Sequence, residues 1–261
     1  MTEASQPDQS ALERIVEQAI SLARARGATA AEAGVGVSTG LSVTVRLGEV
    51  ETLEYQRDRS LGVTVYAGQR KGSASTANLS PGAVEETVAK ALSIATFTTE
   101  DQYAGLPDAA LMASNLPDLD LCHPWELDAS GAIDLAKRCE AAGLATDQRI
   151  RNSEGASVST HRKLRVFGNS HGFVGGYPST SHSVSCVVLG QDDDDMQRDY
   201  WYTAARDWRA LEDIEEVGRK AARKAVERLG AGKLSTRKAP VLFAPDLARG
   251  LVGHFVGAIG G

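Results

Sequence analysis

Apolar positions near the start of the chain recur with the spacing of a helix. The residues that share one helical face are Leu12, Ile15, Val16, Ala19 and Ala23. Separations of three, four and seven residues are those of an amphipathic helix. The helix is expected to end at Gly27, because glycine accepts the left-handed conformation that commonly follows a last turn.

Alternation of apolar and polar residues then predicts strands. The apolar members are Leu41, Val43, Val45 and Leu47 in one run, and Leu61, Val63 and Val65 in the next. A period of two is that of a strand with one buried face. Turns are expected at four glycines, namely Gly48, Gly62, Gly68 and Gly72. Residues 31–78 are therefore predicted to form an antiparallel meander.

Four further helices and a second block of strands follow. A helix is predicted from Ser80, where serine can cap free amides and Pro81 suits the first position. Residues 98–127 contain three prolines and no clear period, which predicts a long irregular connection. The remaining expectations are a helix from Asp128 to about Thr146, strands over 149–204, a helix over 211–229, a short buried strand over 239–244 and a last helix capped by Asp246.

Strands that cluster in runs indicate an α+β fold, with antiparallel sheet blocks and packed helices, in preference to a parallel doubly wound sheet. The 261 residues, of which 42% are hydrophobic, suffice for one large domain or two small ones. The net charge of −6 disfavours nucleic-acid binding by general electrostatic attraction, although a local basic patch stays possible.

The cellular setting expected from the sequence is the cytoplasm. Cys122, Cys139 and Cys186 form no Cys-x-x-Cys pair, and three reduced thiols are typical of a cytosolic protein. The polar, acidic start lacks the pattern of a signal peptide, and no run of about 18 apolar residues predicts a membrane span.

The residues that can carry chemistry form no complete catalytic centre. Convergence of His161, His171 and His182 from neighbouring strands remains open, but no histidine pair has the i, i+4 spacing of metal ligands on a helix. The acidic run 192–195 lacks the spacing of a calcium loop and is interpreted as a solvated hairpin tip. No serine lies in a Gly-x-Ser-x-Gly elbow.

Two further segments have open interpretations. The cations Arg70 and Lys71 are expected at a solvated turn, with an anion contact as the alternative. On a strand, Tyr200 and Tyr202 share one face and Trp201 takes the other. These rings suit either a peptide or subunit contact or core packing.

Several ordered segments together resemble one family. They are Arg70-Lys71-Gly72-Ser73-Ala74-Ser75, Asn152-Ser153-Glu154-Gly155, Phe167-Gly168-Asn169-Ser170-His171-Gly172, Met196-Gln197-Arg198-Asp199-Tyr200, 233–241 and 250–259. In this order they resemble the TldD/PmbA (modulator of DNA gyrase) metalloprotease family, and within it the PmbA/TldE type of subunit. The resemblance runs from about Leu12 to the end of the chain.

The resemblance implies a function. It implies a heterodimeric cytosolic metalloprotease that trims or degrades unfolded peptides, with a TldD-like partner subunit. In that partner a His-Glu-x-x-x-His helix is implied to bind zinc, with the glutamate acting on the metal-bound water. Direct nucleic-acid and membrane partners are not expected.

The segment of this chain that corresponds to the zinc helix begins at His254. Phe255 stands at the glutamate position and Ile259 at the second histidine position. Phenylalanine cannot transfer a proton and isoleucine cannot bind a metal, so His254 is a lone remnant. We therefore expect no catalytic residue, metal site or cofactor in this chain, with zinc in the partner.

Family members are considerably longer, so the chain is expected to be an amino-terminal portion. Residues 1–235 are predicted to form an amino-terminal α+β domain and 236–261 the start of a truncated carboxyl-terminal domain. Two alternatives stay open. One is a non-proteolytic regulatory protein that acts on DNA gyrase or a toxin–antitoxin system; the other is an independent serine–histidine hydrolase with His171 as its candidate.

Overall fold

The computed structural model describes residues 8–113 and 115–260. Its α-helices are α1 (Gln9–Ala25), α2 (Pro81–Phe97), α3 (Ala129–Leu144), α4 (Ile214–Glu227) and α5 (Pro245–Ile259). Its strands are β1 (Ala30–Arg46), β2 (Glu49–Ala67), β3 (Arg70–Thr76), β4 (Ile150–Asn169), β5 (Val174–Asp192) and β6 (Asp195–Ala205). Two short 3-10 turns cover Ala109–Leu111 and Trp208–Ala210. The chain divides into two compact units, one up to Leu229 and one from Gly230.

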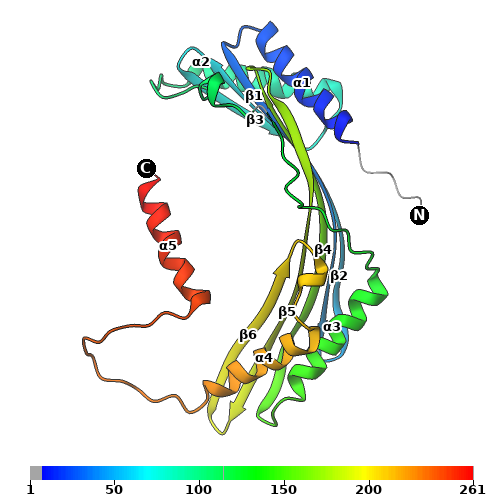
Figure 1. The fold of residues 1–261 in the computed structure, drawn as a ribbon, viewed down its shortest axis with the longest axis vertical. Coiled ribbons are helices and arrows are strands. Elements are labelled where there is room, and N and C mark those ends of the chain that lie inside the picture. Colours follow the sequence, from blue (N-terminus) through cyan, green and yellow to red (C-terminus); the bar gives the residue numbers. More distant parts are fainter. Residues whose placement is uncertain (1–7, 114, 261) are drawn as a thin grey trace. The chain divides into compact units, whose positions relative to one another are not determined.

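All six strands of the first unit form one antiparallel sheet in the order β3-β2-β1-β4-β5-β6. The α+β class with packed helices and antiparallel strands is confirmed. The two predicted strand blocks are joined by β1 and β4, which pair from Glu32 opposite Asn169 to Val45 opposite Ala156. The long connection 98–127 runs from α2 to α3, and both helices pack on this single sheet (Figure 1).

The helices of the first unit cover one face of this sheet. On β1 the buried side chains occupy odd positions along the whole strand, from Ala31 to Val45. Because alternate side chains of a strand point to opposite faces, the apolar positions at both ends of β1 lie on the same face. The opposite face of β1 carries small and polar residues, among them Ser38, Gly40 and Ser42.

Two separate cores lie on the helix-bearing face. The first joins α1 and α2 to one end of the sheet through residues such as Leu12, Val16 and Val88. The second joins α3 and α4 to the other end through residues such as Ala136 and Val217. The middle of the strands lies between the two cores, which leaves room there for a pocket.

The turns differ in part from the prediction. Gly48 and Gly68 lie in turns with φ of 80° and 64°, as expected. Gly62 and Gly72 lie inside strands, so their assignment to turns was wrong. At Gly72 a Cβ atom would lie 2.1 Å from the Ala91 carbonyl oxygen, so this glycine lets α2 approach the sheet. Leu47 lies in the turn after β1 and not in the strand.

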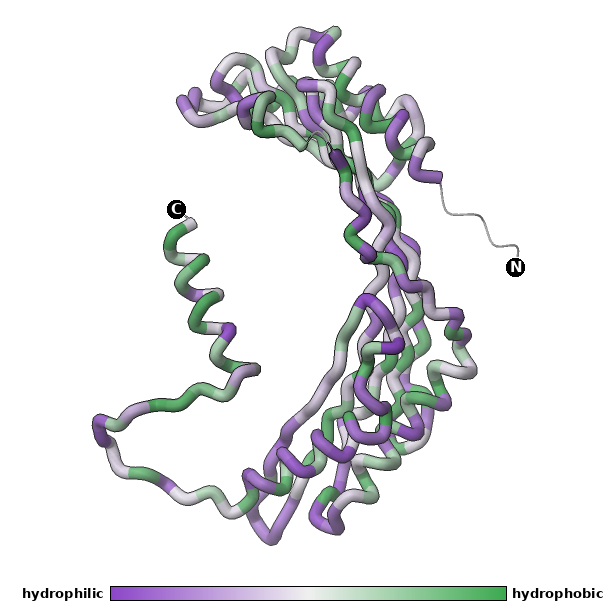
Figure 2. The backbone as a smooth tube through the Cα atoms, viewed as in Figure 1, coloured by the Kyte–Doolittle hydropathy of each residue, from purple (hydrophilic) through white to green (hydrophobic). Residues whose placement is uncertain are grey.

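The second unit consists of an irregular segment and α5. The short buried strand predicted over 239–244 is wrong: these residues carry no strand and are exposed in the part of the chain that is described. Helix α5 begins at Pro245 with Ala244 at its N-cap, and the side chain of Asp246, which was predicted to cap it, lies outside the described part of the structure. Figure 2 shows that hydrophobic residues dominate α5, and Leu247, Phe255 and Ile259 are each about two-thirds exposed within this unit.

No helix among the described residues has the length and apolar character needed to cross a membrane.

Candidate functional site

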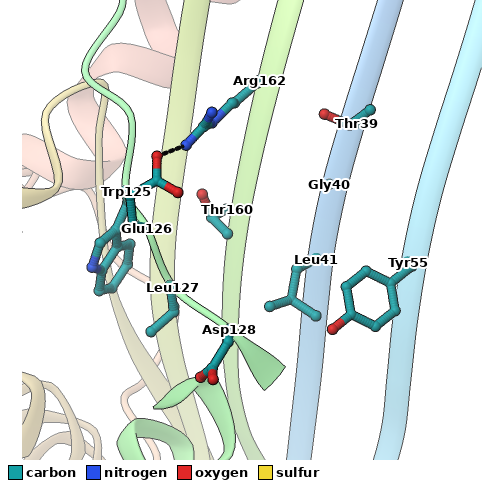
Figure 3. A pocket seen from close by; sticks show the side chains of 10 residues that line it. All are labelled: Thr39, Gly40, Leu41, Tyr55, Trp125, Glu126, Leu127, Asp128, Thr160 and Arg162. Atoms are coloured by element: carbon teal, nitrogen blue, oxygen red, sulfur yellow. Dashed lines mark hydrogen bonds and ion pairs between the residues drawn. The ribbon is translucent and has the colours of Figure 1, made fainter. Parts of the chain in front are cut away.

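A pocket of about 380 Å³ lies on the helix-bearing face, between the two cores. Three neighbouring strands and the segment before α3 line it, as Figure 3 shows. The lining residues are Thr39, Gly40 and Leu41 from β1, Tyr55 from β2, Thr160 and Arg162 from β4, and Trp125, Glu126, Leu127 and Asp128 from the segment.

A buried histidine fixes this segment to the sheet. His182 is fully buried, and its Nε2 lies 2.9 Å from the His123 carbonyl oxygen. A carbonyl oxygen only accepts, so Nε2 carries the proton and Nδ1 accepts the Thr160 hydroxyl at 2.9 Å. The Thr180 hydroxyl oxygen accepts the His123 backbone N–H at 2.9 Å. The segment is thus hydrogen-bonded directly to β5, and the His182 ring connects it to Thr160 of β4.

Aromatic contacts complete this support. Trp125 meets the His182 ring edge-on, with ring centres 5.6 Å apart. Trp125 also stacks on Trp208, with ring centres 5.7 Å apart. Such pairs stabilise by about 0.5–1.5 kcal/mol beyond area burial. They hold the pocket wall in one position.

Charge inside the pocket comes from an ion pair. Arg162 on β4 donates to the Glu126 carboxylate, as the dashed line in Figure 3 shows. Glu126 is largely exposed, so solvent screens this pair and leaves it weak. The pocket therefore offers a guanidinium, two carboxylates and a tyrosine hydroxyl beside apolar surface, which suits binding of a side chain.

The histidines do not converge. In the β4–β5 register His161 pairs with Ser181 and His182 pairs with Thr160. Neighbouring positions of a strand face opposite sides, so His182 points toward the helices and His161 toward the open face. His171 lies at the turn between β4 and β5, 3.1 Å by its Nε2 from the Pro107 carbonyl oxygen. The convergence of His161, His171 and His182 that the sequence left open is therefore wrong.

His161 occupies a defined place on the open face. Its ring covers Gly40, where a Cβ atom would lie 2.1 Å from the imidazole Nδ1. Burial lowers the pKa of His161, and the charge of Lys163 lowers it further, while Asp58 acts in the opposite direction. His161 is thus biased toward the neutral form.

The other candidates are explained by the fold. The acidic run forms the tip of the β5–β6 hairpin, since β5 ends at Asp192 and β6 begins at Asp195. Tyr200 and Tyr202 stack on each other with ring centres 6.3 Å apart, on the same side of β6 as predicted. Trp201 lies on the other side, where its Nε1 donates to Glu212.

The sequence did not indicate the role of Glu140. This carboxylate on α3 is 1% exposed and accepts the backbone N–H groups of Leu47 and Gly48 at 2.8 and 2.9 Å. It thereby holds the β1–β2 turn against α3. The one indication in the sequence was that Glu140 is a lone acid inside an apolar helical stripe. Its hydrogen-bond partners are about ninety positions away in the chain, so no local pattern identifies them.

The segment that begins at His254 lies on α5, with Phe255 and Ile259 on the same helix. These three positions do not fit a metal ion, because two of the side chains have no donor atom. Across residues 8–113 and 115–260, no three histidine, cysteine or acidic side chains lie close enough together to hold a metal.

A helix-covered antiparallel sheet of this topology is found in known proteins. The fold matches the crystal structure of a putative modulator of DNA gyrase from Bacteroides thetaiotaomicron, with a TM-score of 0.78 and 23% identity over 85% of this chain and 51% of that one. It also matches TldE from Thermococcus kodakarensis, with a TM-score of 0.65 and 17% identity over 81% and 47% of the two chains.

Sequence comparison gives the family. Residues 31–95 match the PmbA/TldA metallopeptidase domain 1, and residues 122–229 match the PmbA/TldA metallopeptidase central domain. The chain is 49% identical to Metalloprotease PmbA of Escherichia coli O157:H7 and 44% identical to a Metalloprotease PmbA homolog of Haemophilus influenzae, each over 96% of this chain. The chain belongs to the PmbA/TldA metallopeptidase family, which confirms the resemblance.

The chain spans 55% of the length of each of these two relatives.

Proposed function

We propose that this chain is part of a PmbA/TldE-type subunit that lacks a catalytic metal site of its own. It acts in the cytoplasm with a TldD-like metallopeptidase subunit, which supplies the zinc. Its own role is to hold unfolded peptides in an extended form while the partner cleaves them.

One observation carries this proposal. In a chain of a metallopeptidase family, the stretch 254–259 of α5 has one possible metal ligand, His254, and apolar side chains at Phe255 and Ile259. A metallopeptidase needs at least three protein ligands and a base near the bound water. If a partner subunit carries these ligands and this base, a chain of a metallopeptidase family can lack them on α5.

The exposed apolar side chains of α5 support a second part of the proposal. A helix that is apolar on several sides is normally buried. Leu251, Val252 and Val256 are all more than half exposed within their unit. We infer that residues 236–261 begin a carboxyl-terminal domain whose further sequence covers this helix.

The test uses the full-length protein together with its TldD-like partner and an unfolded, fluorogenic peptide. The mixture should cleave the peptide, and a zinc chelator should abolish cleavage. The full-length protein alone should show no cleavage above background. Chelator-sensitive cleavage by this protein alone would refute the non-catalytic role.

A matched pair of variants, one in each subunit, tests which of the two subunits carries the catalytic histidine. His254→Ala in this protein should leave cleavage by the mixture within about twofold of the original. Alanine at the first histidine of the partner's His-Glu-x-x-x-His helix should abolish it. Loss of activity with His254→Ala in a folded complex would show that His254 takes part in the chemistry.

The same preparation tests the regulatory alternative. Recovery of gyrase without a TldD-like protein in a pull-down, together with no peptide cleavage by the mixture, would favour a non-proteolytic role.

A further inference from the structure

One edge of the sheet has a long stretch without a neighbouring strand. Strand β3 pairs with β2 only from Leu61 to Ala67. Residues 49–60 of β2 therefore have no strand on their outer side in the described part of the chain, and all of them are exposed. An edge of this kind presents free backbone N–H and C=O groups that can pair with another chain.

The pairing of β2 with β1 shows which face of the sheet each charged residue of this edge lies on. Directly opposite residues share a face, so Tyr55 and Arg59, which pair with Leu41 and Val37, lie on the helix-bearing side. Glu54 pairs with Ser42 on the open side.

Asp58 lies on the same open side, opposite Ser38. Over residues 53–59 the helix-bearing side of the edge is thus cationic and aromatic, whereas the open side is acidic. Charges that merely protect an edge from aggregation need no such separation.

The pocket described above lies directly beside this edge. Tyr55 lines the pocket, is 71% exposed and belongs to the outermost strand at this point. A strand added to β2 would lie about 4.8 Å away and would turn every second side chain to the helix-bearing side. Those side chains meet Tyr55 and Arg59 and have the pocket of Figure 3 beside them.

We propose that residues 49–60 of β2 bind an extended peptide as an added strand, with acidic or aromatic side chains on the helix-bearing side and basic side chains on the open side. Backbone hydrogen bonds supply affinity that is independent of sequence, and the two charged faces supply preference. The proposal rests on the peptide-holding role proposed above and names the edge that performs it.

Binding of synthetic peptides to the 261-residue chain tests this inference without the partner subunit. The probe is a fluorescent peptide in which glutamate and lysine alternate around one central tyrosine. It should bind at least about tenfold more tightly than a peptide of the same composition with its glutamates and lysines in separate halves. Equal affinity of the two peptides would overturn the charge preference.

Backbone methylation identifies the mode of binding. Two versions of the probe carry N-methyl groups on the odd or on the even positions. An added strand directs only one alternate set of its N–H groups to the edge. One version should lose about tenfold or more in affinity, because several backbone hydrogen bonds are lost together, and the other should bind as before. Equal loss in both versions would rule out strand addition.

Substitutions in the protein locate the edge. Glu54→Lys combined with Asp58→Lys should weaken binding of the alternating probe at least about fivefold and favour a probe with glutamate in place of lysine. Tyr200→Ala on β6, at the other edge of the sheet, should change nothing. A larger effect from Tyr200→Ala than from the β2 substitutions would place the peptide elsewhere.

The outcomes separate this inference from the proposed function. A folded chain that binds no probe refutes the β2 site but leaves cleavage with the partner to be measured independently. Cleavage that fails in the mixture refutes the subunit role even when the probe binds β2.

Discussion

The imidazole of His182 donates from Nε2 to the backbone carbonyl oxygen of His123, 2.9 Å away. One residue lies in the middle of β5, and the other lies in the segment that leads to α3. This hydrogen bond places the wall of the pocket over the gap between the two cores. It also assigns a structural role to a histidine that the sequence presented as a possible metal ligand.

Replacement of His182 should therefore reduce stability. His182→Phe keeps an aromatic ring but leaves the His123 carbonyl and the Thr160 hydroxyl without their buried partner. The free energy of unfolding should fall by about 1–3 kcal/mol, as measured by urea denaturation. As a control, His254→Ala at an exposed position should change it by less than about 0.5 kcal/mol. No difference between the two variants would contradict the structural role.

Glu140 should be similarly sensitive to a change of one atom. In Glu140→Gln one of the two accepting oxygens becomes an N–H₂ group, which faces the N–H of Leu47 or Gly48. Hydrogen bonds to charged groups contribute about 1.5–3 kcal/mol each, so unfolding should become easier by an amount in that range. The exposed Glu17→Gln is the matched control. Unchanged stability of Glu140→Gln would show that the turn does not depend on this carboxylate.

The contact between α3 and α4 depends on a glycine. A Cβ atom at Gly218 would lie 2.0 Å from the Cys139 carbonyl oxygen, whereas a Cβ atom at Gly82 would meet nothing within 4 Å. Gly218→Ala should destabilise the protein by about 1–3 kcal/mol or more through overpacking. Gly82→Ala, in the first turn of α2, should be neutral or stabilising by up to about 1 kcal/mol. Melting temperatures of the two variants in the opposite order would contradict the close helix packing.

The titration of His161 gives a prediction for pH. Burial first and Lys163 second lower its pKa below 6.5, while Asp58 opposes them. In an NMR titration, Lys163→Gln should raise this pKa and Asp58→Asn should lower it. The unfolded chain binds the proton more readily, so this group stabilises the fold above pH 6.5 and loses that contribution as the pH falls through the folded value. A pKa above 6.5 would contradict the burial of the ring.

Sequence patterns predicted the elements whose partners are close in the chain. The stripe of Leu12, Val16, Ala19 and Ala23 is buried as expected, because a period of 3.6 is a property of one helix alone. The apolar run 239–244 was misassigned to a buried strand, since a short apolar run does not reveal what covers it.

The site was less predictable. The pocket depends on the pairing of β1 with its two neighbouring strands. Leu41 of β1 lies opposite Tyr55 of β2 and, on its other edge, opposite Thr160 of β4. Register is a long-range property, so no local pattern indicates that these residues meet. The same reason explains why the opposite orientations of His161 and His182 became evident only in the sheet.

The subunit role is tested most directly by peptide cleavage measured with three samples: the full-length protein alone, the TldD-like partner alone, and the two together. A non-catalytic role predicts chelator-sensitive cleavage by the mixture, none by the full-length protein alone, and activity within about twofold of the original when the mixture carries His254→Ala. Chelator-sensitive cleavage by this protein alone, lost in His254→Ala, would contradict it.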